Sequence, residues 1–251
     1  MNTVSQICYN EEQRNACVFP ALFNTDCTEF FENSIIVESV RQSAHVDSKW
    51  FGVLSWRLRQ KLSLVALPNM IPPRLRWLAH RMMDPELRKR VPLPLYCSLK
   101  GVDIPTEFDR RIQLVHDDVG AFSIIAFGPV NLMRQANRVH PGFEPHFRKM
   151  ADAIGIHTIH SEYEFPMFFN YWLMRSEVAE QYVNEALVPA MDYLITVKEL
   201  YAGTRYRFMK LPTHLRGKWG SDYFPMHPFL LERLPTVWLK HRGIVTSTLG
   251  F

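Results

Sequence analysis

Glycine is scarce in this chain, and the glycine-rich motifs that cradle phosphate groups are absent. Only 11 of the 251 residues are glycine, and neither GxGxxG nor GxxxxGK(S/T) occurs. GxSxG and HExxH are missing as well. These absences argue against the usual dinucleotide-binding fold, the P-loop enzymes, the α/β-hydrolases and the HExxH metalloproteases.

Cysteines and long apolar runs are also few. The spacing of the four cysteines forms no CxxC pair and fits no zinc template (Cys8, Cys17, Cys27 and Cys97). No stretch approaches 18 continuous apolar residues, so no transmembrane helix is expected. The first residues lack the basic and apolar regions of a secretory signal. We therefore expect free thiols and a cytoplasmic protein.

The charge balance is only mildly basic. The formal net charge is +4, from 29 Lys and Arg against 25 Asp and Glu, and no basic stripe typical of nucleic-acid binders is present. We therefore expect no nucleic-acid partner. The densest basic segment, 74–90, alternates cationic with apolar residues. It predicts a solvated helix face, a contact with the inner membrane surface or a polyphosphate contact.

The order of the apolar segments predicts a single α/β domain over residues 1–251. A β-rich segment at 4–9, an amphipathic helix at about 28–44 and an apolar strand at 50–56 form a βαβ pattern. Seven prolines in 61–112 predict an insert or lid. Further elements are expected downstream: strands at 121–127, 165–174 and 244–251, and helices at 144–155, 177–201 with a kink at Pro189, and 228–243 with a kink at Pro235.

Two short motifs point to phosphate or metal chemistry. Asp117 and Asp118 follow His116, and adjacent carboxylates can hold a divalent cation; a polar turn is the alternative. His140 opens a His-Pro-Gly turn, where it can donate to a phosphate or simply belong to the turn. Asn10 and Arg57 each follow a predicted strand, and ligands of α/β sheets bind beyond such strand ends.

Polar residues in apolar surroundings are the other candidates. Asn170, beside Trp172, lies in an apolar stretch, where it contacts either a sugar or backbone. Glu232 and Arg233 interrupt the apolar start of the last helix. They form either a structural ion pair or a catalytic base with a phosphate ligand, and His227 precedes them.

Several segments carry a resemblance by their order and spacing: VSQICYNEEQR, TEFFENSIIVESVRQ, SKWFGVLSWRLRQK, NRVHPGFEPHFRKMADAIG, MFFNYWLMRSEVAEQYV and HPFLLERLPTVWL. Together they resemble a family of bacterial surface-polysaccharide proteins related to capsular polysaccharide glycosyltransferases. The resemblance implies a GT-A-type nucleotide-sugar transferase, with a mainly parallel mixed sheet flanked by helices. It matches Asn170, Glu232 and Arg233 to family positions, whereas the Asp-x-Asp metal motif of many such enzymes is missing.

The resulting functional hypothesis is sugar transfer from a nucleotide-diphosphate donor to a glycan or lipid-linked acceptor. Glu232 is the expected base. Asn10, Arg57, Arg233 and His140 are the expected donor ligands, and Asn170, Trp172 and His227 are expected at the acceptor or sugar. Asp117 and Asp118 are the candidates for binding Mn²⁺ or Mg²⁺.

Two other functions fit parts of the sequence. A metal-dependent phosphohydrolase requires one metal to bring together His80, His116, Asp117 and Asp152. A non-catalytic glycan-binding or assembly protein would keep the transferase fold with a damaged metal motif.

Overall fold

The computed structural model describes residues 2–25, 27–42, 46–59, 103–124, 129–167, 170–202 and 210–249. The predicted insert at 61–112 lies outside these ranges except for its last ten residues. The basic segment 74–90, His80 and Cys97 therefore lie outside the described residues. The three cysteines that are described are free thiols, as expected (Cys8, Cys17 and Cys27).

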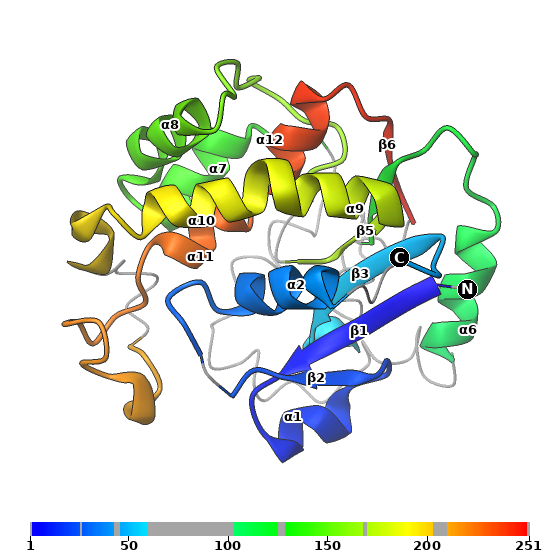
Figure 1. Ribbon diagram of the computed structural model, residues 1–251, viewed down its shortest axis with the longest axis horizontal. Coiled ribbons are helices and arrows are strands. Elements are labelled where there is room, and N and C mark those ends of the chain that lie inside the picture. The colour runs from blue at the N-terminus through cyan, green and yellow to red at the C-terminus, as the bar shows by residue number, and fades with distance from the viewer. Residues whose placement is uncertain are drawn as a thin grey trace, which may run out of the picture.

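The described strands form one mixed sheet in the order β2-β1-β3-β5-β4-β6. Strands β1, β2, β3, β4 and β6 run in one direction and β5 runs in the other, which confirms a mainly parallel α/β sheet flanked by helices (Figure 1). The strands are β1 (Asn2–Cys8), β2 (Ala21–Phe23), β3 (Trp50–Ser55), β4 (Ala121–Ser123), β5 (Trp172–Arg175) and β6 (Thr246–Thr248).

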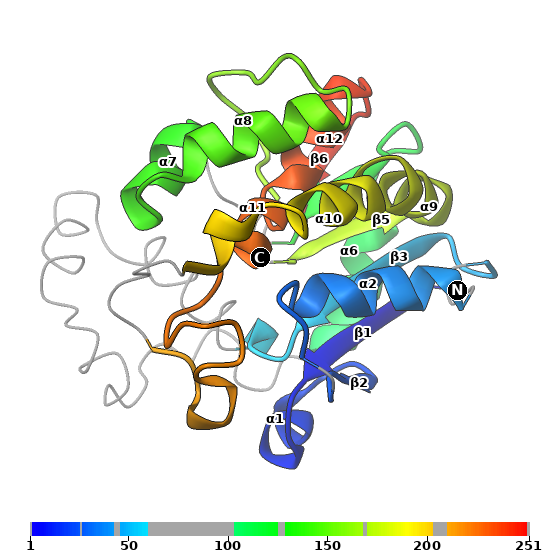
Figure 2. The ribbon, with the colours of Figure 1, turned by 60° about the vertical axis from the view of Figure 1, so that its left-hand side comes forward.

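The predicted βαβ unit is confirmed. β1 and β3 pair in parallel, and the helix between them, α2 (Glu32–Arg41), packs against the sheet (Figure 2). α2 is shorter than the predicted 28–44. It begins after Phe31, whose backbone φ of 51° leaves the helical region, and no side chain caps its first turn. The short strand β2 and helix α1 (Glu11–Ala16) lie between β1 and α2 and were not predicted.

Both faces of the sheet are buried, because successive side chains of a strand point to opposite faces. Phe51 of β3 joins the larger core, beneath most of the helices, and its neighbour Trp50 joins a second core. The second core is covered by α6 (Ile104–Ile112), which contributes Ile104, Phe108 and Ile112. The end of the predicted insert is therefore a packed helix.

The remaining helices belong to the larger core or its rim. They are α7 (Leu132–Val139), α8 (Phe143–Ala153), α9 (Ser176–Tyr182), the π-helix η2 (Val183–Leu187), α10 (Val188–Leu194), α11 (His227–Leu231) and α12 (Leu234–His241), with 3₁₀ turns η3 (Lys198–Ala202) and η5 (Thr213–Leu215).

Prolines shape the two long C-terminal helices. Pro189 stands at the start of α10, directly after the π-helical turn η2, so one wide turn replaces the predicted kink. Pro235 lies in the first turn of α12, and the predicted single helix is divided into α11 and α12. Proline lacks the backbone N–H that would continue the first helix. Glu232 and Arg233 therefore occupy the junction between the two helices.

Replacement of Gly52 by alanine is expected to destabilise the sheet by about 1–3 kcal/mol. An added Cβ would lie 2.9 Å from the carbonyl oxygen of Trp172 and 2.1 Å from the Cδ2 of Leu173. The leucine can rotate, but the carbonyl belongs to the neighbouring strand, so β3 and β5 must separate locally. The midpoint of urea unfolding measures this effect; an unchanged midpoint would contradict the close approach of the two strands.

Candidate functional site

Polar side chains gather where the parallel strands β1 and β3 end, which is the edge where α/β sheets bind ligands. Tyr9 follows β1, and Ser55 is the last residue of β3. Glu32 opens α2 at this edge. Asn170 and Tyr171 precede β5, which runs in the opposite direction and therefore starts here. We call this group of five residues, together with Arg57 and Glu232, the carboxyl-edge cluster.

A hydrogen bond between Glu32 and Asn170 is central to this cluster. The Nδ2 atom of Asn170 donates to Oε2 of Glu32 at 3.0 Å, and the hydroxyl of Ser55 also hydrogen-bonds to Glu32. Burial raises the pKa of Glu32, and the two hydrogen bonds and the nearby charge of Arg57 partly oppose that rise. The chain thus holds a desolvated carboxyl group close to a cationic side chain.

Unusual backbone conformations flank this hydrogen bond. Among the described residues, the only non-glycine residues with positive φ are Phe31, at 51°, and Asn170, at 56°. Phe31 is the direct neighbour of Glu32, so both partners of the bond depend on a disfavoured conformation. Such conformations cost about 1–3 kcal/mol each and concentrate at functional sites. The predicted strand 165–174 is therefore corrected. Asn170 lies in a turn, and the strand β5 begins only after it, at Trp172.

Asn170 is 2% exposed, and its Oδ1 atom accepts no hydrogen bond from any described residue. A buried polar atom without a partner costs roughly 1–3 kcal/mol. Most buried polar atoms in proteins are paired, so such an exception requires an explanation.

Glu232 joins the cluster through its charge. Burial is the main cause of the raised pKa values of Tyr9 and Tyr171, and the charges of Glu32 and Glu232 add to both. The side chain of Glu232 is 18% exposed. The helix junction therefore holds a second carboxylate, far from Glu32 in sequence, whose charge acts on the same two tyrosines.

Of the two roles predicted for Arg233, a structural ion pair or a phosphate ligand, its contacts favour the first. Its side chain is 1% exposed; its guanidinium donates to the carbonyl oxygen of Phe229 at 2.9 Å and to Gln135 at 3.3 Å, and pairs with Glu232 at 3.5 Å. It also lies over the ring of Phe143. Arg233 is therefore a structural residue that holds the helix junction.

Asn10 and Arg57 lie at the same edge, as their positions after adjacent parallel strands require. The side-chain oxygen of Asn10 accepts from the backbone N–H of Gln13 and so caps α1. Arg57 is exposed and lies over the ring of Trp56 at 5.0 Å. Arg57 is thus open to an anionic ligand, whereas the side-chain oxygen of Asn10 already caps α1.

The other predicted ligands lie inside the larger core. His140 is buried and stacks on Phe229 with ring centroids 4.0 Å apart. Trp172 is buried against Tyr182. Apolar packing encloses both rings, and the roles of His140 in donor binding and of Trp172 in sugar binding stay predictions.

His227 is also fully buried, and its contact with the acceptor stays a prediction. Its ring lies 4.4 Å from that of Tyr201, whose hydroxyl donates to Glu29, and its Nε2 lies 3.2 Å from the carbonyl oxygen of Leu194. Burial lowers the pKa of His227 to about 4, from 6.5. The imidazole of His227 is therefore neutral and packs inside the protein.

This lowered pKa predicts a loss of stability in acid. Between pH 6.5 and 4 the unfolded chain binds a proton at His227 that the folded chain does not, so the free energy of unfolding falls as the pH falls through this window. The loss at pH 5 is about 2 kcal/mol. His227→Gln keeps a donor for Leu194 but does not titrate. Urea unfolding at pH 7.5 and 5.0 should show a smaller loss for the variant, and equal losses would contradict this assignment.

Asp117 and Asp118 lie at the opposite edge of the sheet, so the structure does not bring these candidate metal ligands together with Asn10 and Arg57. They belong to the segment between α6 and β4, which is drawn on the right of Figure 1. The Asp117 side chain is 92% exposed and lies 3.3 Å from Lys49, which precedes β3. The sheet separates this turn from the carboxyl-edge cluster.

Within the described ranges, no three His, Cys, Asp or Glu side chains come together as a metal site. His116 and Asp117 lie in a turn rather than on the helix that the phosphohydrolase hypothesis requires. Asp152 belongs to α8 and lies 3.3 Å from His157. The described members of the predicted phosphohydrolase set are therefore dispersed.

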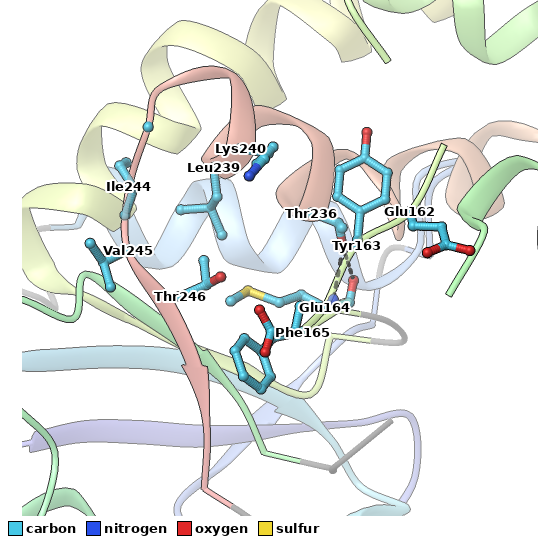
Figure 3. A pocket seen from close by; sticks show the side chains of 12 residues that line it. Glu162, Tyr163, Glu164, Phe165, Thr236, Leu239, Lys240, Ile244, Val245 and Thr246 are labelled. Carbon is cyan, nitrogen blue, oxygen red and sulfur yellow. Dashed lines mark hydrogen bonds between the residues drawn. The ribbon is translucent and has the colours of Figure 1, made fainter. Parts of the chain in front are cut away.

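One pocket of about 320 Å³ lies away from the cluster, between α12, β6 and residues 162–167 (Figure 3). It is lined by carboxylates, a lysine and apolar side chains, among them Glu162, Glu164, Lys240 and Phe165. A second, more open one, of about 510 Å³, lies beside α7 and α8. Neither contains a residue of the carboxyl-edge cluster, and neither carries an orphaned buried side chain. The buried polar atoms therefore favour the carboxyl-edge cluster as the candidate site over either pocket.

None of the helices in the described ranges is long and apolar enough to cross a membrane. Comparison of the chain with protein-family models, with curated proteins and with solved structures gave no match.

Proposed function

We propose that this protein is a glycosyltransferase that binds a nucleotide-diphosphate sugar at the carboxyl-edge cluster. The observation that carries the proposal is the Glu32–Asn170 pair, held by two unusual backbone conformations at the edge where α/β sheets bind ligands. Acceptor oxygens for sugar hydroxyls, a cation for phosphate and a second carboxylate are all present there. The resemblance to capsular polysaccharide glycosyltransferases supports the same class of reaction.

Arg57 is the proposed ligand of the diphosphate. Its guanidinium is exposed at the end of β3, and its charge acts on Glu32 and Tyr171. A planar guanidinium binds phosphate oxygens through charge-assisted hydrogen bonds, which stabilise the leaving diphosphate as the bond to the sugar breaks.

Glu232 is the proposed base for the acceptor hydroxyl. It is partly exposed at the helix junction, and its charge reaches the same two tyrosines as that of Glu32. A positioned carboxylate accelerates such a step by taking the hydroxyl proton as the new bond to the sugar forms. The described residues do not bring together a Mn²⁺ or Mg²⁺ centre, and no step of this proposal runs through a metal.

The acceptor is proposed to be a glycan or a lipid-linked glycan, by the same resemblance. Peripheral contact with the inner membrane remains a prediction of segment 74–90, which lies outside the described residues.

Donor binding is tested by thermal unfolding with UDP, GDP and ADP and with their sugar conjugates, with and without Mn²⁺. A ligand at 100 times its dissociation constant raises the free energy of unfolding by about 2.7 kcal/mol. Arg57→Ala should weaken binding roughly 10- to 100-fold, the scale of a lost hydrogen bond to a charged group. Arg138→Ala, exposed on α7, is the matched control and should bind as the parent does. Failure of every nucleotide to bind would reject the proposal, and binding without turnover would indicate a glycan-binding protein.

A further inference from the structure

We infer that Glu32 and Asn170 bind two neighbouring hydroxyl groups of the donor, the vicinal diol of its ribose or of its transferred sugar. The inference rests on the proposed function and adds a basis for donor selection. It starts from the buried Oδ1 atom of Asn170, which has no hydrogen-bond partner among the described residues, and from the hydrogen bond that fixes this amide.

The direction of the amide follows from the chemistry of its partner. The carboxylate oxygens of Glu32 accept hydrogen bonds, and Asn170 presents its Nδ2 to Oε2 of Glu32 at 3.0 Å. Oδ1 then points away from Glu32 as a second acceptor. The positive φ of Asn170 places this amide where a strand residue would not, and asparagine tolerates that conformation better than most residues.

Two neighbouring hydrogen-bond acceptors select a ligand that carries two neighbouring hydrogen-bond donors. Glu32 keeps lone pairs after accepting from Asn170 and Ser55, because a carboxylate has about four acceptor positions. A cationic ligand is disfavoured beside Arg57, whose charge already acts on Glu32. Neutral hydroxyl groups fit both conditions, and a carboxylate binds ribose hydroxyls in other nucleotide-binding sheets.

The position of Arg57 favours hydroxyls over a nucleobase. If Arg57 holds the diphosphate, the groups nearest to it are the two rings bonded directly to phosphate, the ribose and the transferred sugar. The nucleobase is one ring farther away from the diphosphate. Glu32 lies within electrostatic reach of Arg57, so it should meet one of these hydroxylated rings.

The test measures dissociation constants by calorimetry for the parent chain and for Asn170→Gly, because glycine adopts a φ of 56° without strain and lacks the amide. The ribose is tested with UDP, GDP or ADP, whichever binds most tightly, against its 2′-deoxy and 3′-deoxy forms. The sugar is tested with UDP-glucose against its 2-deoxy and 3-deoxy forms. Glu32→Gln is the second variant and keeps the shape of the side chain.

The parent chain should lose roughly tenfold in affinity when the hydroxyl that meets Asn170 is removed. For Asn170→Gly, the dissociation constants of the unmodified and deoxy ligands should agree within twofold. Glu32→Gln should no longer discriminate between ligands with and without the adjacent hydroxyl. The ligand series that shows this pattern identifies the ring.

Equal affinity of the parent chain for all deoxy forms would overturn the inference while leaving the proposed function intact, as would discrimination that survives in a folded Asn170→Gly. Discrimination among bases alone would assign the amide to the nucleobase and also overturn it. If no nucleotide binds the parent chain, the proposed function itself fails.

Discussion

Glu232→Gln is expected to lower sugar transfer about 100-fold or more while leaving the fold intact, because a general base contributes about 10²–10⁴ to a rate. Glutamine keeps the shape of the side chain and can still accept from Arg233, which also donates to Phe229 and Gln135. The readout is hydrolysis of the nucleotide sugar with water as acceptor, together with transfer to a glycan where one is known.

Glu162→Gln is the matched control for this measurement. Glu162 is an exposed carboxylate in the pocket beside α12, away from the carboxyl-edge cluster, so its removal should leave the rate unchanged. An unchanged rate in Glu232→Gln would remove Glu232 from the mechanism. Loss of folding would instead assign Glu232 to the structural ion pair with Arg233.

Arg233→Met should destabilise the protein by roughly 3 kcal/mol or more, the scale for breaking a buried ion pair by removing one partner. The substitution leaves the carbonyl oxygen of Phe229 and the amide of Gln135 without their donor. It also removes the cation beside Glu232. For a chain of this length each kcal/mol lowers Tm by about 2–4 °C, so Tm should fall by about 6–12 °C.

Arg242→Met is the control for Arg233→Met. Arg242 pairs with Glu185 at 3.5 Å, but both side chains are more than 40% exposed, and exposed pairs contribute little to stability. Its Tm should change by no more than about 2 °C. Equal Tm values for the two variants would contradict the structural role of Arg233.

The βαβ unit could be predicted from the sequence because its signals are local. The apolar run that became β3 and the amphipathic pattern of α2 each follow from the order of a few residues. The edge shared by Asn10 and Arg57 then followed from parallel pairing alone. The same argument could have located Glu32, the first residue of a helix that begins at this edge, but its apolar neighbours Phe30 and Phe31 indicated a buried face instead.

The surroundings of the other candidate residues depend on distant segments. The sequence left open whether Arg233 forms a structural ion pair or binds phosphate, and Gln135, far away in sequence, helps to enclose it. His140 and Trp172 have flat rings with few polar atoms, and the surrounding helices decide that both rings are buried. Asp117 and Asp118 precede a strand rather than follow one, which places them at the edge opposite to the cluster.

Hydrogen–deuterium exchange, with and without the nucleotide sugar that gives the largest thermal shift, tests most directly whether the donor binds at the carboxyl-edge cluster. We expect slower exchange in three segments, 8–14, 55–59 and 170–172, with no change at 113–119 on the opposite edge. Slower exchange at 113–119 with none in the three cluster segments would contradict it, because the donor would then bind at the edge that holds Asp117.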